Sequence, residues 1–550
     1  MMKKYIASCV ILTILSCSTG KNITQNTQTK KKSPFLWENA TIYFLMTDRF
    51  FNGDPSNDFK HPQNAQPAPY RGFMGGDISG ITQKIKQGYF DSLGVNAIWM
   101  TPLVENIQGS VDEGTGTSYG FHGYWTRDWT AIDKRLGTRE QLKEMVKTAH
   151  MHGIKVLFDV VINHTGPVTP LDSKWPDDWV KTGPRCSYKG FETTVNCTLV
   201  DNLPDTRTES TKEVQLPEFL VQKWKNEGRY DQEVKELDNF FAKTKYPRRP
   251  YYYIVKWITD MIEDFGIDGY RVDTAKHTEE EVWQVLYNES IPVFKNYKKL
   301  HPEEGQGDTP FFMTGEVWGY NIGSGRIYDF GDRKVDYFNF GFNSLINFDF
   351  KSDANKSYED IFSKYEIQLH GPLKGKTVLN YLSSHDDGSP FDPNRTKSME
   401  SATKLLLAPG QVQIYYGDES ARPLTVNASG DAKLRSFMNW EDQQKPATSS
   451  ILNHWKKLGQ FRRDHPSIGA GHHTMLNNKP YVFSRTYMDD KVVVGLDLDK
   501  KTKIISCAGV FEDGEELRDA YSGKIAKVAK GFVVIDSDAS LVLLEKLNRN

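Results

Sequence analysis

The chain has 550 residues, and its 69 basic and 71 acidic side chains leave a formal net charge of -2 at pH 7. So balanced a charge gives no electrostatic reason to bind a polyanion, so no nucleic-acid partner is expected. Hydrophobic residues at 38% and charged residues at 25% are values of a globular protein. The length exceeds one ordinary domain but fits one large barrel, which takes roughly 250 residues or more, with accessory parts.

The N-terminus carries an export signal. Lys3 and Lys4 precede an apolar stretch, residues 5–15, which has the length of a signal-peptide core and is too short to span a bilayer. We predict a signal peptide over residues 1–17, ending in Ile14-Leu15-Ser16-Cys17. This ending resembles a bacterial lipobox and implies lipidation of Cys17, so that a lipid anchor is the only membrane contact. Secretion with ordinary cleavage is the alternative. Residues 18–33 are polar and predict a flexible tether.

Three cysteines remain beyond the export signal. Cys186 and Cys197 lie close together in a Gly- and Thr-containing loop, and an exported chain can oxidise them. We predict a local disulfide, with two unpaired thiols as the alternative. Cys507 is predicted to be buried and inert. The sequence has no Cys/His spacing typical of a zinc site.

Strand and helix signals alternate along most of the chain. Thr138 and Gln141 form a capping-box pattern before a helical period that Gly153 ends, and a strand at 156–161 follows. The same order recurs before a strand at 269–272, and it is typical of a parallel sheet. The predicted strands are 42–46, 97–100, 156–161, 269–272, 311–314, 337–340, 378–382 and 413–416. Eight such units predict an α/β fold with a (β/α)8 TIM barrel over residues 34–467.

Two accessory regions are predicted. After the third strand, residues 165–216 have no helical period and many Pro, Gly, Asp and Thr, which predicts an inserted irregular domain with a functional role. From residue 468 to 550 short alternating runs replace the helical period, at 481–485, 492–496, 503–507, 532–535 and 540–544. These runs predict a C-terminal antiparallel β domain, a small β-sandwich.

Three predicted strands each end in a carboxylate: Asp273, Glu316 and Asp386. Parallel strands deliver these acids to one end of a barrel, where active sites are built. Retaining hydrolysis of a glycosidic bond needs two carboxyl groups about 5 to 5.5 Å apart. Arg271 lies two residues before Asp273 and would keep it ionised, while apolar neighbours of Glu316 favour its protonated form. Each acid taken alone is more typical of a surface or salt-bridge group. Their joint placement at strand ends indicates a catalytic site.

Four ordered motifs resemble signatures of the α-amylase family, glycoside hydrolase family 13. They are residues 159–164, 269–277, 314–318 and 381–387, and segments 94–102, 203–205 and 410–419 resemble flanking signatures. The likeness covers about residues 40–465 and looks most like the exported maltodextrin-degrading α-amylases of Gram-negative bacteria. This implies a periplasmic or cell-surface lipoprotein. The chain departs from the pattern at Ser384, where many members carry Asn, which puts the subfamily in question.

The resemblance implies a role for each matched residue. Asp273 would be the nucleophile, Glu316 the general acid/base and Asp386 the transition-state stabiliser. Tyr124 would stack on the sugar at the cleavage site, although core packing is the alternative for its ring. The other predicted substrate-binding residues are Arg271, His164 and His385, which would bind hydroxyls or orient acids, and Lys276 and His277 on the leaving-group side.

The resemblance also implies calcium, which takes oxygen ligands. One site would use Asn163, Asp205 and the backbone carbonyl of His277 to pin the inserted loop to the barrel, with Glu192 as a further candidate. A second site would use a cluster of oxygen-bearing and turn-forming residues similar to calcium-binding segments in cyclodextrin-forming and cyclodextrin-cleaving relatives. The alternative is a turn stabilised by Asx hydrogen bonds. This second set is Asn52, Asp54, Asn57, Asp58, Gly75 and Asp77.

The predicted function is that of a retaining, endo-acting α-amylase that hydrolyses α-1,4-glucosidic bonds in starch or maltodextrins. The alternative is another enzyme on the same scaffold: an α-glucosidase, a cyclodextrin hydrolase or a glucosyl transferase. The residues that line the sugar subsites, rather than the catalytic acids, determine which of these activities results. A second alternative is a surface lipoprotein that binds starch without turnover. The partner is an α-glucan, and the sequence gives no prediction of oligomeric state.

Overall fold

The computed structural model describes residues 34–305 and 307–547. The predicted signal peptide, the lipobox at Cys17 and the tether lie outside the described residues. Within the described part of the chain, no helix has both the length and the apolar character needed to cross a membrane.

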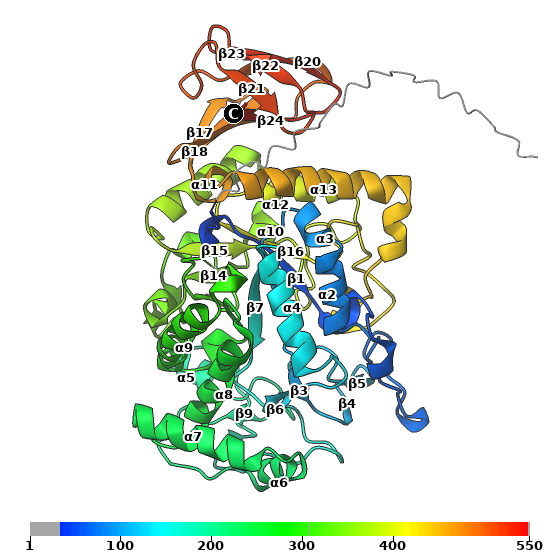
Figure 1. Ribbon diagram of the computed structural model, residues 1–550, viewed down its shortest axis with the longest axis vertical. Coiled ribbons are helices and arrows are strands. Elements are labelled where there is room, and N and C mark those ends of the chain that lie inside the picture. Colours follow the sequence, from blue (N-terminus) through cyan, green and yellow to red (C-terminus); the bar gives the residue numbers. More distant parts are fainter. Residues whose placement is uncertain (1–33, 306, 548–550) are drawn as a thin grey trace, which may run out of the picture.

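Eight parallel strands close into a barrel, as predicted (Figure 1). Neighbouring strands follow the order β1-β16-β15-β14-β11-β10-β7-β2 around the barrel. The sequence therefore predicted the α/β class and the (β/α)8 architecture correctly. The strands are β1 (Thr41–Leu45), β2 (Ala97–Met100), β7 (Lys155–Val160), β10 (Gly269–Val272), β11 (Phe312–Gly315), β14 (Ser344–Asn347), β15 (Thr377–Asn380) and β16 (Gln411–Tyr415).

One predicted strand was wrong. Residues 337–340 form a 3-10 helix, η7 (Tyr337–Phe340), and the barrel strand at this point is β14, a few residues later. The Asp336 side chain accepts a hydrogen bond from the Phe338 amide and starts the helical turn, and Gly341 follows it with φ 99°. The buried rings of η7 gave the same apolar signal as a strand, because a short apolar run does not distinguish the two.

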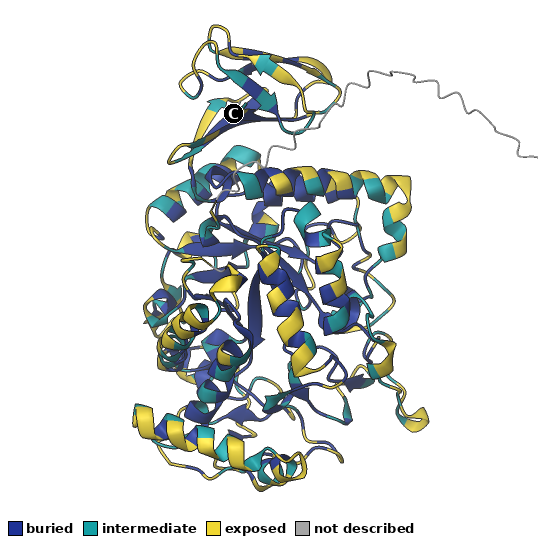
Figure 2. Ribbon diagram, viewed as in Figure 1, coloured by how far each residue is buried: buried dark blue, intermediate teal, exposed yellow. Residues whose placement is uncertain are grey.

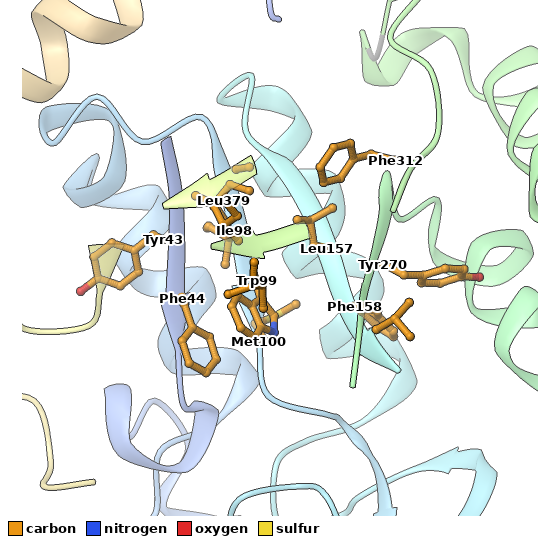
Figure 3. Packing of buried hydrophobic residues seen from close by; sticks show 14 of the residues in the cluster. Tyr43, Phe44, Ile98, Trp99, Met100, Leu157, Phe158, Tyr270, Phe312 and Leu379 are labelled. Carbon is orange, nitrogen blue, oxygen red and sulfur yellow. The ribbon is translucent and has the colours of Figure 1, made fainter. Parts of the chain in front are cut away.

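The barrel interior is filled by large side chains from several strands. Phe44 on β1 stacks on Trp99 on β2 with ring centroids 3.7 Å apart, and Figure 3 shows these rings among aliphatic side chains of neighbouring strands. Figure 2 shows the eight barrel strands buried, while the surrounding helices expose one face. Strands buried on both faces explain why the sequence of each strand is a nearly continuous apolar run.

Helices form the outer ring. α4 (Arg139–Met151) begins with the predicted capping box of Thr138 and Gln141, and α8 (Pro250–Phe265) ends at Gly266, which takes a left-handed φ of 72°. These two helices therefore begin and end where their cap residues predict. The other long helices around the barrel are α2 (Ile78–Lys86), α9 (Glu280–Leu300), α11 (Tyr358–His370), α12 (Ser398–Leu406) and α13 (Pro446–Asp464).

The segment between β7 and α8 is the inserted region. Its first part holds only short elements, and the predicted disulfide joins Cys186 to Cys197. Two helices that the sequence analysis did not identify follow, and Figure 1 shows them at the end of the molecule opposite the C-terminal domain. The elements are β8 (Val180–Lys181), α5 (Phe191–Val195), β9 (Asp205–Thr206), α6 (Glu218–Asn226) and α7 (Tyr230–Thr244).

The C-terminal domain is antiparallel, as predicted. A six-stranded sheet in the order β17-β18-β19-β24-β21-β22 faces the pair β20-β23 across a core that includes Val493, Ile505 and Leu544. Cys507 lies in this core, and burial raises the pKa of its thiol to about 12, which makes it inert as predicted. The strands are β17 (His472–Asn477), β18 (Tyr481–Tyr487), β19 (Asp490–Leu496), β20 (Lys501–Ser506), β21 (Glu516–Asp519), β22 (Ile525–Lys527), β23 (Phe532–Ser537) and β24 (Val542–Lys546).

Candidate active site

The three predicted acids lie at the carboxyl ends of barrel strands. Val272 of β10 pairs in register with Gly315 of β11, so the next residues, Asp273 and Glu316, leave the sheet side by side. Asp386 follows in the loop after β15. The barrel topology thus delivers all three to the end where loops build active sites.

Arg271 links two of these acids directly. Its Nη1 atom lies 2.8 Å from Asp273 Oδ1, and its Nη2 atom lies 2.6 Å from Glu316 Oε2. The guanidinium is buried, and its carbon lies 5.0 Å from the centroid of the Trp99 ring. A fixed, buried cation thus holds both carboxyl groups against one side of the site.

Asp159 belongs to the same cluster, and the sequence analysis gave it no role. It pairs in register with Arg271, and Arg271 Nη1 lies 2.8 Å from its Oδ1 atom. Its Oδ2 atom accepts hydrogen bonds from Trp99 Nε1 at 2.9 Å and from the Tyr124 hydroxyl at 2.7 Å. The signal that could have identified it is its place on β7 directly opposite Arg271 on the neighbouring strand.

The surroundings shift the pKa values of two of these acids, Glu316 and Asp386, in opposite directions. Burial raises the pKa of Glu316 well above its ordinary value; Arg271 opposes this, while the charges of Asp273 and Asp386 add to it. The Thr274 amide donates a hydrogen bond to Glu316 Oε2 at 3.1 Å, which orients the carboxyl group. Glu316 is therefore suited to hold a proton near neutral pH.

Asp386 has the opposite tendency. Burial acts to raise its pKa, but His385 and the cations Arg271 and Arg435 outweigh this and hold the pKa below its ordinary value. The Ser384 hydroxyl donates a hydrogen bond to Asp386 Oδ1 at 2.9 Å. Ser384, the position that departs from the family pattern, therefore orients this acid.

Tyr124, His164 and His385 lie around the acids. The Tyr124 ring stacks on His385 with centroids 5.2 Å apart and planes 20° apart. His164 Nε2 lies 3.1 Å from the Tyr124 carbonyl oxygen, and burial lowers the pKa of His385 to about 4, so His385 is neutral at pH 7. Tyr124 is half-buried, so its ring is only partly packed into the protein.

Lys276 and His277 lie on η4 (Ala275–His277), which follows Asp273. Lys276 Nζ donates a hydrogen bond to the Trp318 carbonyl oxygen at 3.1 Å. His277 Nδ1 lies 3.1 Å from the carbonyl oxygen of Thr194 on α5, and burial lowers its pKa to about 4. The His277 ring therefore contacts the inserted segment.

The first predicted calcium set contains an unpaired buried oxygen. Asn163 Nδ2 lies 3.4 Å from Asp205 Oδ1, while Asp205 Oδ2 is buried and has no hydrogen-bond partner. Burial raises the pKa of Asp205 to about 7. Thr278, which follows His277, donates a hydrogen bond to Asn163 Oδ1 at 3.4 Å. The orphaned carboxylate oxygen of Asp205 fits a hard cation, and the amide of Asn163 would offer its oxygen to the same ion after a flip about its last side-chain bond. Glu192 is exposed and accepts a hydrogen bond from Asn196.

The second predicted set divides in two. Asp54 accepts hydrogen bonds from Ser56, and Asp77 caps α2 by accepting from the Gly80 amide at 2.6 Å, so both are engaged in the Asx hydrogen bonds of the alternative interpretation. The others face one another: Asn52 Nδ2 donates to Asp58 Oδ1 at 2.8 Å.

Around Asn52 and Asp58, two side-chain oxygen atoms remain without a hydrogen-bond partner. The side-chain oxygens of Asn52 and Asn57 are buried without partners. Gly75 has φ 89°, and a Cβ atom there would lie 2.7 Å from Asp58 Oδ1. This part of the set, Asn52, Asn57, Asp58 and Gly75, fits a cation better than Asp54 and Asp77 do.

An eight-stranded parallel barrel with a buried acid cluster at the carboxyl ends of its strands defines the class of TIM-barrel glycosidases. Residues 44–455 match the family Alpha-amylase, described as "Alpha amylase, catalytic domain". The chain belongs to this α-amylase family, glycoside hydrolase family 13, and is an enzyme of the glycoside hydrolase class.

Known relatives agree with this assignment. The periplasmic alpha-amylase of Escherichia coli (strain K12) is 35% identical over 546 residues, covering 88% of this chain and 76% of the relative. A cyclomaltodextrin glucanotransferase of Bacillus sp. (strain 6.6.3) is 27% identical, and the match covers 84% of this chain but 59% of that protein. The solved α-amylase of Geobacillus thermoleovorans, complexed with acarbose, shares the fold with a TM-score of 0.65 at 23% identity, covering 94% of this chain and 100% of that structure.

Proposed function

We propose that this enzyme hydrolyses internal α-1,4-glucosidic bonds of starch or maltodextrins and retains the configuration at the anomeric carbon. The observation that carries the proposal is the bond of one guanidinium, Arg271, to both Asp273 and Glu316. Because the two carboxyl groups bind neighbouring nitrogens of one guanidinium, we expect them to lie about 5 to 5.5 Å apart, as in retaining enzymes. The two carboxyl groups of inverting enzymes lie roughly 6.5 to 9.5 Å apart.

In the first step, an oxygen of the Asp273 carboxylate attacks the anomeric carbon. Glu316 gives its proton to the glycosidic oxygen, so that the bond to the leaving chain breaks and a glycosyl ester forms on Asp273. In the second step, the Glu316 carboxylate takes a proton from water, whose oxygen attacks the anomeric carbon and releases Asp273. The raised pKa of Glu316 supports its role as the proton donor.

The neighbouring residues would hold the sugar. Asp386, with its lowered pKa, would stay ionised and stabilise positive charge on the ring in the transition state. Tyr124 would stack on the sugar at the cleavage site, supported by the bond of its hydroxyl to Asp159. The remaining proposed substrate contacts are Arg271, His164 and His385 around that sugar and Lys276 and His277 on the leaving-group side.

Calcium fits this architecture. Asn163, Asp205 and the backbone carbonyl of His277 would hold one ion, and Asn52, Asn57, Asp58 and Gly75 a second. Bound calcium would supply structural cross-links, the first between the inserted segment and the barrel. The unpaired Asp205 Oδ2 atom supports the first site.

We also propose that the protein is exported and anchored by lipid at Cys17. The Cys186–Cys197 disulfide supports an oxidising compartment, and a relative is named as periplasmic. Expression with a radiolabelled fatty acid should label the wild-type protein and leave Cys17→Ala unlabelled. Label in both proteins, or in neither, would contradict the anchor at Cys17.

Maltoheptaose tests the proposed activity. With calcium present, proton NMR should show several shorter oligosaccharides in the first minutes, released as α anomers. Glucose alone would indicate an α-glucosidase, longer or cyclic products a glucosyl transferase, and a preference for cyclodextrins a cyclodextrin hydrolase. A starch-binding protein without turnover would leave the substrate unchanged, and initial β anomers would contradict retention.

A further inference from the structure

Three side chains that can bind a metal ion converge where the barrel meets the C-terminal domain. Glu366 and His370 lie one turn apart on α11, and His472 is the first residue of β17. Their candidate ligand atoms all lie within 4.8 Å of one another. Figure 1 shows α11 beside β17 and β18, at the end of the molecule opposite the inserted segment.

Both imidazole rings face one carboxylate. The Nδ1 atom of His472 lies 2.9 Å from Glu366 Oε1, and the Nδ1 atom of His370 lies 2.9 Å from Glu366 Oε2. The two rings stack with centroids 4.0 Å apart and planes 28° apart. The cluster thus directs two nitrogens and two oxygens at a common region.

The surroundings fix the orientation of His370 and Glu366. His370 Nε2 lies 3.3 Å from the carbonyl oxygen of Ala470, which can only accept a hydrogen bond, so the ring carries a proton on Nε2. Its Nδ1 atom is buried and makes no hydrogen bond of acceptable geometry. The His473 amide donates to Glu366 Oε2 at 3.1 Å. Metal-binding histidines typically donate a hydrogen bond from the ring nitrogen that does not bind the metal, as His370 Nε2 does to the Ala470 carbonyl.

Two arrangements can satisfy these groups: hydrogen bonds, with His472 donating from Nδ1 to Glu366 Oε1 and a protonated His370 pairing with Oε2, or one metal ion bound by all three side chains. The metal-bound arrangement needs neither ring to be protonated, so it places no positive charge on two rings that stack with centroids 4.0 Å apart. One divalent ion would satisfy both nitrogens and the carboxylate together. The rings also border a cavity of about 440 Å³ that both domains line, which leaves room for a water ligand.

We propose that Glu366, His370 and His472 bind one Zn²⁺ ion that clamps the barrel to the C-terminal domain. Two imidazoles and a carboxylate suit zinc, whereas calcium takes oxygen ligands alone. The sequence showed no zinc spacing because the ligands come from a helix and a strand that lie far apart in the chain. The ion would act structurally, since the active site lies at the other end of the barrel.

Calorimetric titration with zinc chloride tests the proposal. The mature protein is stripped with a chelator, returned to calcium-containing buffer and compared with His472→Gln, His370→Gln and His301→Gln. His301 is the matched control, because among the described residues it belongs to the other group of three His and Glu side chains whose candidate ligand atoms all lie within 4.8 Å of one another. His472→Gln should fold normally, since the His472 side chain is 68% exposed.

The wild type and His301→Gln should bind one equivalent of Zn²⁺, and the other two variants should bind it at least about 10-fold more weakly. Zinc should raise the Tm of the wild type and of His301→Gln but not of His472→Gln. Cobalt should give the strong visible absorption of a four-coordinate site in the wild type and in His301→Gln, but not in His370→Gln or His472→Gln. A wild type that binds no zinc, or a His472→Gln variant that binds it as tightly, would overturn the proposal.

Discussion

The two ends of strand β10 both carry buried ionic clusters, yet the clusters differ in charge balance. At the amino end, the Asp268 carboxylate lies 2.9 Å from His150 Nε2 and 3.2 Å from Lys155 Nζ, and His150 Nδ1 lies 2.7 Å from Glu304. Two acids thus face two basic groups. Burial acts to raise the pKa of Asp268, but Lys155 and His150 hold it below its ordinary value.

At the carboxyl end, four acids surround one guanidinium. Arg271 bonds to Asp159, Asp273 and Glu316, and Asp386 lies near enough to raise the pKa of Glu316 further. The excess negative charge keeps a proton on this end of the strand. Equal burial therefore has two outcomes: a balanced cluster supports stability, and an unbalanced one poises an acid for catalysis.

The largest expected effect is on catalysis at the carboxyl end. Asp273→Asn removes the proposed nucleophile while keeping the shape of the side chain, so kcat on maltoheptaose should fall by about 10⁴-fold or more. Tm should stay close to that of the wild type, because the charge excess around Arg271 falls. An unchanged kcat would remove Asp273 from its assigned role.

The matched change at the amino end should reverse this pattern. Asp268→Asn breaks a buried ionic cluster and should lower the free energy of unfolding by about 3 to 5 kcal/mol. At temperatures where the variant stays folded, kcat should equal that of the wild type. Urea unfolding and maltoheptaose kinetics on the same preparation give both values, and a lowered kcat with unchanged stability would contradict the assigned division between the two ends.

The amino-end cluster should also make stability depend on pH. Burial alone would lower the pKa of His150, but Asp268 and Glu304 raise it to about 9. The folded pKa lies above the unfolded value of about 6.5, so this stabilisation is fully present below pH 6.5 and is lost as the pH rises to about 9.

The difference between the folded and unfolded pKa of His150 corresponds to about 3 kcal/mol of stabilisation. Tm of the wild type should therefore fall as the pH rises from 6.5 to about 9. His150→Gln should be less stable at pH 6 and should lack this component of the fall. If the Tm values of the two proteins keep a constant difference from pH 6 to pH 9, His150 is not the titrating group.

The smallest expected effect comes from calcium near the carboxyl end. Chelation should lower Tm by a few degrees, at about 1 °C for each kcal/mol of stabilisation lost from a barrel of this size. Asp205→Asn should already show most of this loss and respond little to the chelator. An equal chelator response in wild type and variant would remove Asp205 from the calcium site.

The sequence predicted the features that depend on one strand at a time. Parallel strands share their carboxyl edge, so the acids after β10, β11 and β15 could be placed together without coordinates. Caps such as Thr138 and Gly266 likewise act within a few residues. The fold class, the disulfide and seven of the eight barrel strands followed from such local rules.

Features that depend on contacts between distant segments could not be predicted in this way. Asp159 became recognisable only when β7 and β10 were paired in register. Burial of the η7 rings made 337–340 look like a strand, and Glu366 meets His472 only because the C-terminal domain folds back onto α11. In each case a tertiary contact decided the outcome.

Trapping the glycosyl ester tests the central claim most directly. Glu316→Gln should still react with a 5-fluoro-α-glucosyl fluoride, since fluoride leaves without a proton, and the intermediate should accumulate because the base of the second step is missing. Mass spectrometry of a peptic digest should then find one added 5-fluoroglucosyl group on Asp273. Label on another residue, or no label while the sugar fluoride is consumed, would contradict the assignment of Asp273 and Glu316.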